Sequence, residues 1–415
     1  MYKIMVLLLA LAGLTGRIRA DTLEVKPGLP DAIARTIAAA KPHDVVLVEH
    51  GHYMEWDLII DKPLIINGLG LPVIDGHYQS GSILTILADS VTVSGFEFRN
   101  VGKSYTMDLA GIRLEDNSAC RIENNVMRDN FFGIYLKRVK NTRISGNTLI
   151  SAAENEVNSG NGIHLWYCER IEIENNLVNG HRDGIYLEFV EHSQVKGNIS
   201  ENNLRYGLHF MFSNYDLYER NTFRSNGTGV AVMYSKEIDM IGNRFLDNWG
   251  SASFGLLLKD ITDGLLKGNV FENNTQGIYA DGSNRLRITE NDFIGNGWAM
   301  NIFGNCEDNE IHRNNFLGNA FDITTNSNRN PNSYLNNFWD QYNGYDLDRD
   351  GIGDVPYRPV RLFSYVTGRI PEAIVLHRSF FVDVINLAEK VAPSLTPVSL
   401  EDPAPRMKRI LHDRH

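Results

Sequence analysis

Short runs of alternating apolar and polar residues recur through the middle of the chain. Each run opens on a glycine, as in Gly184-Ile-Tyr-Leu, and an asparagine, here Asn198, follows that glycine fourteen residues later. From each asparagine to the next glycine the spacing varies between 8 and 15 residues. One part of the repeat is therefore constant, and the other holds all the insertions. The opening glycines are Gly111, Gly133, Gly162, Gly184, Gly207, Gly229, Gly255 and Gly277.

A repeat of this length predicts a solenoid, in which each unit packs on its neighbours. The commonest period is 22 residues, and the period-two alternation of apolar residues indicates half-buried strands. Three short strands and three turns fit into one such repeat. We therefore predict an all-β protein, a right-handed parallel β-helix with coils about 4.8 Å apart. Asparagine suits the coil corners because it tolerates left-handed backbone and its amide can bond the asparagine of the next coil.

The N-terminal end departs from the repeat. Residues 1–20 contain Lys3, an apolar run and a small residue, Ala20, which is typical of a cleaved signal peptide. The alternative is a membrane anchor, although an apolar run of about eleven residues is too short to span a bilayer. We assign residues 21–337 to the β-helix and expect a helix over residues 29–40 to cap its first coil, because an open end would expose strand edges.

The composition changes again after residue 337. We assign residues 338–372 to a C-terminal cap with an Asp-rich loop, and residues 373–415 to a helical arm and tail. The arm contains an apolar helical segment between Ala373 and Ala392, and prolines follow it. Since a Pro-rich tail has little to pack on by itself, we expect this arm to reach a partner.

Net charge bears on the kind of partner. The chain carries a formal charge of −11, and loss of residues 1–20 removes Lys3, Arg17 and Arg19, which leaves −14. An acidic chain without a basic block does not favour nucleic acid as a partner. The three cysteines are widely spaced and odd in number, so a disulfide framework is not expected.

Alternation along the strands places two columns of side chains on the outside of one sheet. In the middle coils these columns are rich in aromatic residues, histidine and methionine, which marks a binding site more often than a solvated surface. The first column reads Arg113, Tyr135, His164, Tyr186, His209, Ala231 and Leu257, and the second reads Glu115, Lys137, Trp166, Glu188, Met211, Met233 and Lys259. We predict a binding face made by Tyr135, His164, Trp166, Tyr186, Glu188 and, from an inserted loop, Met107.

The insertions border the same sheet. They cover residues 103–109, 152–161 and 248–254, and all of them fall in the turn before the opening glycine. Insertions confined to one edge of a solenoid usually build its binding surface. Neutral surface loops are the alternative.

A candidate copper site lies in the second column. Met211 and Met233 occupy the same position in adjacent coils, so their backbones are expected about 5 Å apart. His209 precedes Met211 by two residues on the same outward face. Thioethers and imidazole are ligands for Cu(I). Packing of these side chains under a loop is the alternative, and it stays open.

The sequence Asp346-Leu-Asp348-Arg-Asp350-Gly-Ile-Gly-Asp354 resembles the first nine positions of a calcium-binding loop. Tyr357 stands where the closing glutamate of a helix-loop-helix hand would be. We therefore predict a simpler structural Ca²⁺ turn with the four aspartates as ligands, and we keep a solvated acidic loop as the alternative.

Enzymatic chemistry finds little support in the sequence. Carboxylates that cooperate on sugars lie about 5 to 10 Å apart, whereas Glu115, Glu188 and Asp281 are three and four coils from one another. Serine-nucleophile and phosphate-loop motifs are absent. A polysaccharide lyase, hydrolase or epimerase remains the alternative function, because β-helices often carry such enzymes and the aromatic face could stack sugars.

The non-repetitive part carries a specific resemblance. The segments Asn336-Asn-Phe-Trp-Asp340, Gly344-Tyr-Asp-Leu-Asp348, Asp350-Gly-Ile-Gly-Asp-Val-Pro-Tyr-Arg358, Leu387-Ala-Glu-Lys-Val391 and Pro393-Ser-Leu-Thr-Pro397 follow the glycine and asparagine repeats. Together they resemble the NosD family of periplasmic maturation proteins of nitrous oxide reductase, over essentially the whole mature chain.

The resemblance implies a non-catalytic accessory protein in the periplasm. Its expected partners are the permease and ATPase subunits of an ABC transporter, a copper-chaperone lipoprotein and nitrous oxide reductase, whose copper-sulfur centre is assembled. The membrane is reached only through the transporter, and the C-terminal helix and arm would dock on the permease. Transient Cu(I) on Met211, Met233 and His209 is our inference from the residues and is not carried over from the family.

Overall fold

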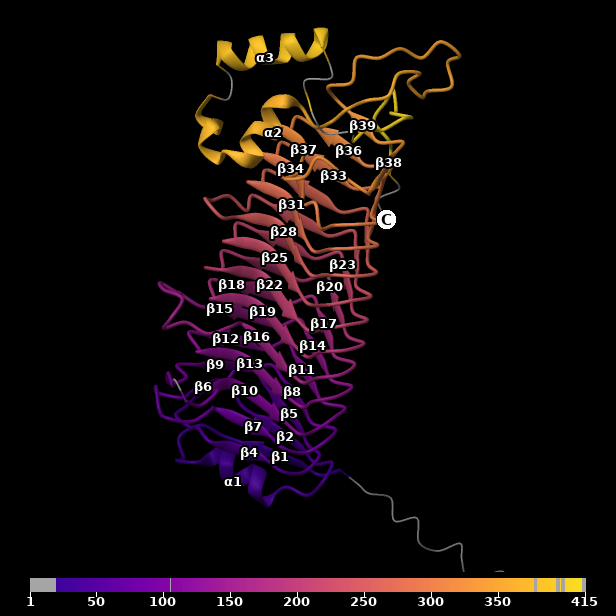
Figure 1. Cartoon of the computed structure of the whole chain (residues 1–415). Helices are drawn as coiled ribbons and strands as arrows, with labels where there is room; N and C mark the ends of the chain where they lie inside the picture. The colour runs from indigo at the N-terminus through magenta and orange to yellow at the C-terminus, as the bar shows by residue number, and fades with distance from the viewer. Residues whose placement is uncertain (1–19, 105, 377–378, 393–395, 397–399, 413–415) are drawn as a thin grey trace, which may run out of the picture.

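The computed structural model describes residues 20–104, 106–376, 379–392, 396 and 400–412. These residues form a right-handed parallel β-helix with a helix at its N-terminal end and three helical segments at its C-terminal end (Figure 1). The predicted fold is thereby confirmed. The predicted signal peptide lies outside the described residues, except for Ala20.

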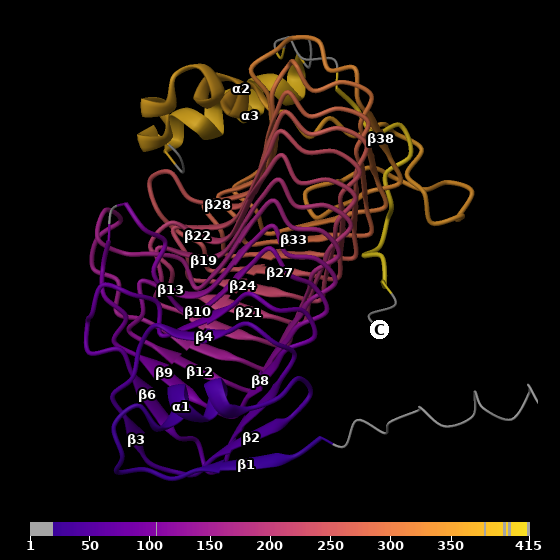
Figure 2. The ribbon, with the colours of Figure 1, turned by 90° about the horizontal axis from the view of Figure 1, so that it is seen from below.

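Each coil between the first and the last contributes one strand to each of three parallel sheets, which enclose the core (Figure 2). Sheet A has 14 strands, one on each coil from the first to the last. They are β1 (Thr22–Val25), β2 (Val45–Val48), β5 (Ile65–Gly68), β8 (Thr92–Ser94), β11 (Arg121–Glu123), β14 (Arg143–Ser145), β17 (Glu172–Glu174), β20 (Gln194–Lys196), β23 (Leu217–Glu219), β26 (Asp239–Ile241), β29 (Leu265–Lys267), β32 (Arg287–Thr289), β35 (Glu310–His312) and β38 (Ser333–Leu335).

Sheet B follows sheet A along each coil and has 13 strands. They are β3 (His52–Tyr53), β6 (Val73–Asp75), β9 (Glu97–Arg99), β12 (Val126–Arg128), β15 (Thr148–Ile150), β18 (Leu177–Asn179), β21 (Ile199–Glu201), β24 (Thr222–Arg224), β27 (Arg244–Leu246), β30 (Val270–Glu272), β33 (Asp292–Ile294), β36 (Asn315–Leu317) and β39 (Phe338–Trp339).

Sheet C has 12 strands, begins after the variable turn and carries the predicted binding face. Its strands are β4 (Leu58–Ile60), β7 (Leu84–Ile86), β10 (Ala110–Glu115), β13 (Phe132–Lys137), β16 (Ile163–Trp166), β19 (Asp183–Glu188), β22 (Tyr206–Met211), β25 (Thr228–Met233), β28 (Phe254–Lys259), β31 (Gln276–Asp281), β34 (Trp298–Ile302) and β37 (Phe321–Thr324).

A ladder of buried asparagine side chains joins the coils at the corner between sheets A and B. The amide nitrogen of Asn198 donates to the side-chain oxygen of Asn221 over 3.0 Å, and Asn221 donates to Asn243 in the same way. The residue before each of these asparagines, for example Gly197 at φ +62° or Asn175 at φ +54°, holds the left-handed backbone. The two properties that we predicted for one asparagine are thus divided between two residues: the ladder asparagine makes the bond to the next coil, and the residue before it holds the left-handed backbone. The ladder comprises Asn125, Asn147, Asn176, Asn198, Asn221, Asn243, Asn269, Asn291, Asn314 and Asn337.

A second ladder, which the sequence analysis did not single out, stands at the turn before sheet C. Successive members bond side chain to side chain or side chain to backbone over 2.9 to 3.2 Å, and they are Asn203, Asn226, Asn248, Asn274, Asn296 and Asn319. Both ladders keep buried amides paired from coil to coil, which removes the cost of burying them.

Inside sheet B the apolar core becomes a column of aromatic rings. Phe245 and Phe271 stack with centroids 4.6 Å apart, and Phe316 stacks on Trp339 at 4.1 Å. The remaining side chains of the core are mostly Val, Ile and Leu. Identical residues in register therefore stack on themselves in all three sheets.

Both ends of the stack are covered. At the N-terminal end, α1 (Ala32–Ala39) confirms the predicted cap, and the Glu55 carboxylate accepts hydrogen bonds from the backbone nitrogens of Ile33 and Ala34. At the C-terminal end lie α2 (Leu362–Arg369), the 3₁₀ helix η1 (Pro371–Leu376) and α3 (Phe380–Val391) (Figure 1). In the described part of the chain, no helix is long and apolar enough to cross a membrane.

Asp402 closes the first ladder. Its carboxylate accepts hydrogen bonds from the backbone nitrogens of Asn336, Asn337 and Ala404, from the Asn337 amide and from Trp339 Nε1, all between 3.0 and 3.2 Å. A carboxylate is suited to this place because it accepts only and needs no further coil to bond to.

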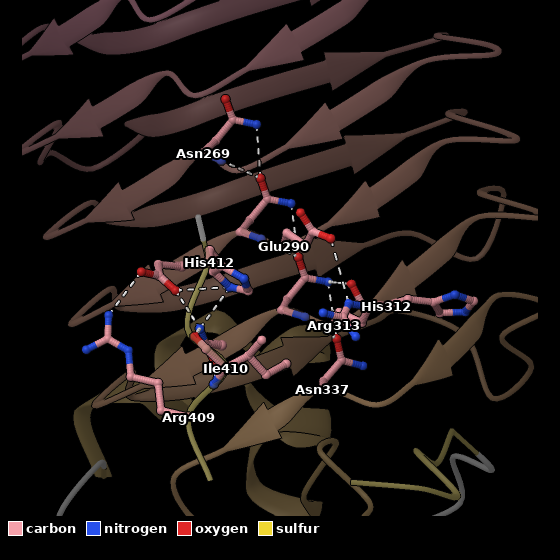
Figure 3. Close-up of polar contacts among 12 residues, drawn as sticks. Asn269, Glu290, His312, Arg313, Asn337, Arg409, Ile410 and His412 are labelled. Carbon is pink, nitrogen blue, oxygen red and sulfur yellow. Dashed lines mark hydrogen bonds and ion pairs between the residues drawn. The ribbon is translucent and has the colours of Figure 1, made fainter. Parts of the chain in front are cut away.

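Residues 400–412 return along sheet B, where we expected an arm that extends away. The Asn315 side chain accepts a hydrogen bond from Ile410 N and donates one to Ile410 O, both 2.9 Å long. Figure 3 shows Ile410 between Arg409 and His412 in this returning segment. Arg409 and His412 lie 3.0 and 3.5 Å from the Asp292 carboxylate. The bonds of Asp402 to the end of the ladder, and those of residues 409–412 to Asn315 and Asp292, hold the tail against sheet B. The Pro-rich composition alone did not reveal these contacts.

The ladder generates a stability prediction. Replacing Asn221 by Ala removes its bonds to Asn243 and the Val195 carbonyl, and it leaves the buried backbone nitrogen of Asn198 without its acceptor, Asn221 Oδ1. We expect a loss of about 2–4 kcal/mol in the free energy of unfolding, because each stranded buried group costs about 1–3 kcal/mol. Urea unfolding followed by circular dichroism measures it. Asn214→Ala, at a partly exposed turn, is the matched control, and equal losses in both variants would contradict the ladder's role.

Candidate functional site

The register of sheet C confirms that the two predicted columns run straight across the coils. Tyr135, His164, Tyr186 and His209 pair in that order, and Met211 pairs with Met233 in the next coil. The opening glycine is required where these strands begin. A Cβ atom at Gly184 would collide with Ser200 Oγ and lie 2.6 Å from Gly207 O, so the coils could not approach.

Because Gly184 and Ile185 both point inward, the strand bulges there and Asp183 projects outward. A third column thus precedes the two predicted ones, and in the middle coils it contains Phe132, Asp183, Tyr206 and Thr228. The sequence analysis missed it because strict alternation was counted through the glycine. The sequence signal for this column is the glycine that recurs at the start of these strands. The structure explains the glycine, because a Cβ atom there would collide with the next coil.

The aromatic part of the face is largely covered. The His164 ring stacks between Tyr135 and Tyr186, with centroids 5.0 and 4.6 Å away. The Tyr135 hydroxyl donates a 2.9 Å hydrogen bond to Asp108 of the first inserted loop, and only 3% of Tyr135 is exposed. Burial, together with the charge of Arg182, lowers the pKa of His164 to about 3, so its imidazole is neutral.

His209 lies beside the third column. Its Nδ1 is 4.0 Å from Asp183 Oδ2, and its ring contacts Tyr186 and Tyr206 at 5.0 and 4.6 Å. Burial, reinforced by Arg205 and Arg182, lowers the pKa of His209 to about 4. Burial also raises the pKa of Asp183, against the charges of Arg205 and Arg182.

Neither ring nitrogen of His209 and neither carboxylate oxygen of Asp183 has a hydrogen-bond partner among the described residues. Arg205 lies 3.5 Å from Asp183 and 3.9 Å from Glu156 of the second inserted loop. The loops at residues 103–109 and 152–161 therefore contact the face through Asp108 and Glu156.

Met211 and Met233 are half-buried at the other end of their strands. In the following turn, Tyr167, Phe189, Phe212 and Tyr234 stack along the axis, with centroids 4.5, 5.1 and 5.2 Å apart. This exposed aromatic strip was not predicted. Its members follow the second column directly in sequence, so the methionines and the strip form one continuous surface.

The remaining predicted binding residues surround this surface. Lys137 Nζ lies 5.5 Å from the centroid of the Trp166 ring, and Glu188 accepts a 3.2 Å hydrogen bond from the Tyr186 hydroxyl. Met107 is 48% exposed on the first inserted loop. Glu115 forms 2.9 Å ion pairs with Arg113 and Lys137, which occupies the carboxylate that an enzyme of sugar chemistry would need free.

The three cysteines are buried and free. Burial raises the pKa of Cys120 and Cys168 to about 11, so these thiols are protonated at neutral pH. Protonated thiols are poor nucleophiles and poor metal ligands.

The Asp-rich loop gathers three of its four predicted ligands. Carboxylate oxygens of Asp346, Asp348 and Asp350 lie within 4.8 Å of one another. Asp354 instead accepts a 2.7 Å hydrogen bond from the backbone nitrogen of Leu347, and Gly351 makes the turn at φ +84°. The arrangement offers oxygen ligands of the kind that Ca²⁺ takes.

Known proteins resemble this chain over most of its length. Residues 151–346 match the model of a family described as "Periplasmic copper-binding protein (NosD)", and residues 73–176 match "Right handed beta helix region". A "Probable ABC transporter binding protein NosD" of Pseudomonas aeruginosa is 29% identical over 85% of this chain and 86% of its own length. The protein of the same name from Stutzerimonas stutzeri is 28% identical over 84% of each chain.

Among solved structures, the Streptococcus pneumoniae surface adhesin PfbA superposes with a TM-score of 0.58 at 12% identity, over 73% of this chain and 99% of that chain. At this identity the likeness shows the fold alone. The family model and the two relatives, by contrast, confirm the resemblance found in the sequence: the chain is similar to NosD proteins.

Proposed function

We propose that this protein is a periplasmic accessory protein for assembly of the copper-sulfur centre of nitrous oxide reductase, and that it receives Cu(I) on the outer face of sheet C and passes it on. The observation that carries the proposal is the pairing of Met211 with Met233 on this face, in a chain similar to a copper-binding family. In this account copper is cargo, delivered by a copper-chaperone lipoprotein and handed to the apo-reductase.

The ligands that we propose are the thioethers of Met211 and Met233 and the imidazole of His209. Thioethers and imidazole suit Cu(I) and hold it less tightly than thiolates, which favours transfer. The lowered pKa of His209 keeps its ring neutral, the form that binds metals, and both of its nitrogens lack hydrogen-bond partners among the described residues. Its ring lies on the Asp183 side of the strand, so its part in ligation is tested by a separate variant.

The C-terminal helices supply the proposed dock for an ABC permease. Along α3, Phe380, Val384, Leu387 and Val391 form one apolar stripe, with exposures between 46% and 82%. A stripe of this kind on a helix marks a protein interface, and the curated relatives are named as ABC transporter binding proteins. The partner ATPase would supply the energy for switching.

We also propose that Asp346, Asp348 and Asp350, with Asp354 as a further ligand, hold a structural Ca²⁺ beside the segment that closes the β-helix. Support comes from the clustered carboxylates and from the nearby bridge between Ile352 and Arg406, which ties the loop to the returning tail.

Copper binding is tested by titrating the purified mature protein with Cu(I) in the presence of a chromogenic chelator. We expect about one Cu(I) per chain, an affinity at least tenfold lower in the double variant Met211→Ala, Met233→Ala, and a smaller loss in His209→Gln. Met54→Ala, at an exposed position near the N-terminus, should not change the affinity. Unchanged binding in the double variant would refute the site.

Docking is tested by co-purification with the permease and ATPase. Leu387→Asp places a charge in the apolar stripe, so we expect at least a tenfold loss of complex while the melting temperature stays the same. Leu29→Asp alters an equally exposed leucine at the opposite end of the molecule and serves as the control. If both variants bind alike, the stripe is not the dock.

Calcium binding is tested by thermal unfolding with and without EDTA. A ligand that binds only the folded state stabilises it by about 2.7 kcal/mol at one hundred times its Kd, so Ca²⁺ should raise the melting temperature. Asp348→Asn with Asp350→Asn should abolish the shift. A shift of equal size in this variant would exclude the loop as the site.

A further inference from the structure

The last coil breaks the glycine rule of sheet C. Strand pairing places Asp322 of β37 beside Ala299, which itself stands beside Gly277. At Gly277 a Cβ atom would lie 2.5 Å from Ala299 O. After β37 no further strand of sheet C follows in the described part of the chain, so a side chain is tolerated here. It lies at the end of the stack, beneath the C-terminal helices.

Asp322 also ends the second asparagine ladder, as Asp402 ends the first, but the two carboxylates differ in what they accept. Asp402 accepts five hydrogen bonds of 3.0 to 3.2 Å. For Asp322 the structure gives one bond, 3.4 Å long, from the Asn319 amide. Only 5% of Asp322 is exposed. Among the described residues, capping the ladder therefore uses little of this carboxylate's hydrogen-bonding capacity, and a buried carboxylate needs partners.

Asp322 lines a cavity of about 460 Å³ between the last coils and the C-terminal helices. Its apolar wall is formed by Phe321 of β37, Phe363 of α2 and Val382 of α3. Trp249 of the third inserted loop also lines the cavity, and 67% of this residue is exposed. A volume of this size is far beyond a packing defect and falls in the range of small-ligand sites, about 300–1,000 Å³.

The charges around the cavity leave an excess of negative charge. Arg361 lines the cavity, whereas Asp322, when it is ionised, and the neighbouring Asp340 together carry two negative charges. Burial, followed by the charge of Asp340, raises the pKa of Asp322 to about 7, against the Asn319 bond and Arg361. In the described part of the chain, Tyr357 is a further titratable group that interacts with Asp322. One added positive charge would balance this set.

We propose that this cavity binds an organic monocation, which carries an ammonium or guanidinium group, with Asp322 as its counter-ion and the aromatic side chains of the lining against its charged group and alkyl part. Aromatic rings attract such cations through their faces. A bare metal ion fits less well, since among the described residues only the Asp346 loop brings three acidic or histidine groups together. The inference is independent of the copper proposal.

The test is calorimetric titration of the mature protein with n-butylguanidinium at pH 8. We expect saturable one-to-one binding that weakens at least tenfold in Asp322→Asn and several-fold in Trp249→Ala. Trp249 is exposed, so its replacement tests the cavity even if Asp322→Asn folds poorly. Asp263→Asn, in an exposed pair with Arg285 on another side of the coil, should bind as the wild type does. The proposal would be overturned if the wild type showed no saturable binding, or if Asp322→Asn and Trp249→Ala both bound the probe as tightly as the wild type.

Three further measurements sharpen the test. Since the pKa of Asp322 lies at about 7, its ionised fraction falls about tenfold from pH 8 to pH 6, and probe binding should fall with it in the wild type only. If the natural cation is a basic side chain of the transporter, Asp322→Asn also weakens that complex; if it is a free amine, the complex persists. Cu(I) affinity should stay unchanged in Asp322→Asn, which separates this inference from the copper site.

Discussion

A buried amide that is satisfied by the coils on both sides of it is the interaction on which the rest of this structure depends. Each ladder asparagine donates to one neighbour and accepts from the other, so no coil is complete by itself. The close stacking that this bonding needs excludes side chains at the opening glycines. The stack must therefore end in a group that accepts without donating, and both ladders end on an aspartate.

This constraint fixes which parts of a coil can vary. Sheets A and B and the ladder corner repeat with little change, whereas the turn before sheet C takes up the insertions without disturbing the bonding. The three inserted loops thus border the same sheet, and Asp108 and Glu156 of the first two loops reach its outer face. Candidate chemistry gathers here because only this side of the scaffold is free to change.

The period of the repeat and its alternation were sufficient to predict the fold, the register of two outward columns and the N-terminal cap. Alternation could not reveal the bulge at Gly184, because that depends on contact between coils, and so the Asp183 column was missed. Nor could it show that Tyr135 and His209 are covered, because the first inserted loop reaches Tyr135 through Asp108, and the rings of Tyr186 and Tyr206 pack on His209. The returning tail was likewise invisible, as it depends on Asp402 meeting the end of a ladder 65 residues earlier.

The central functional claim is that Cu(I) binds to methionine sulfur on the outer face of sheet C. Selenomethionine-labelled protein loaded with Cu(I) makes this visible by X-ray absorption at the copper and selenium edges. The account predicts direct copper-selenium scattering at both edges, lost when Met211 and Met233 are replaced. A copper environment of nitrogen and oxygen alone, or copper-selenium scattering that survives both replacements, would contradict it.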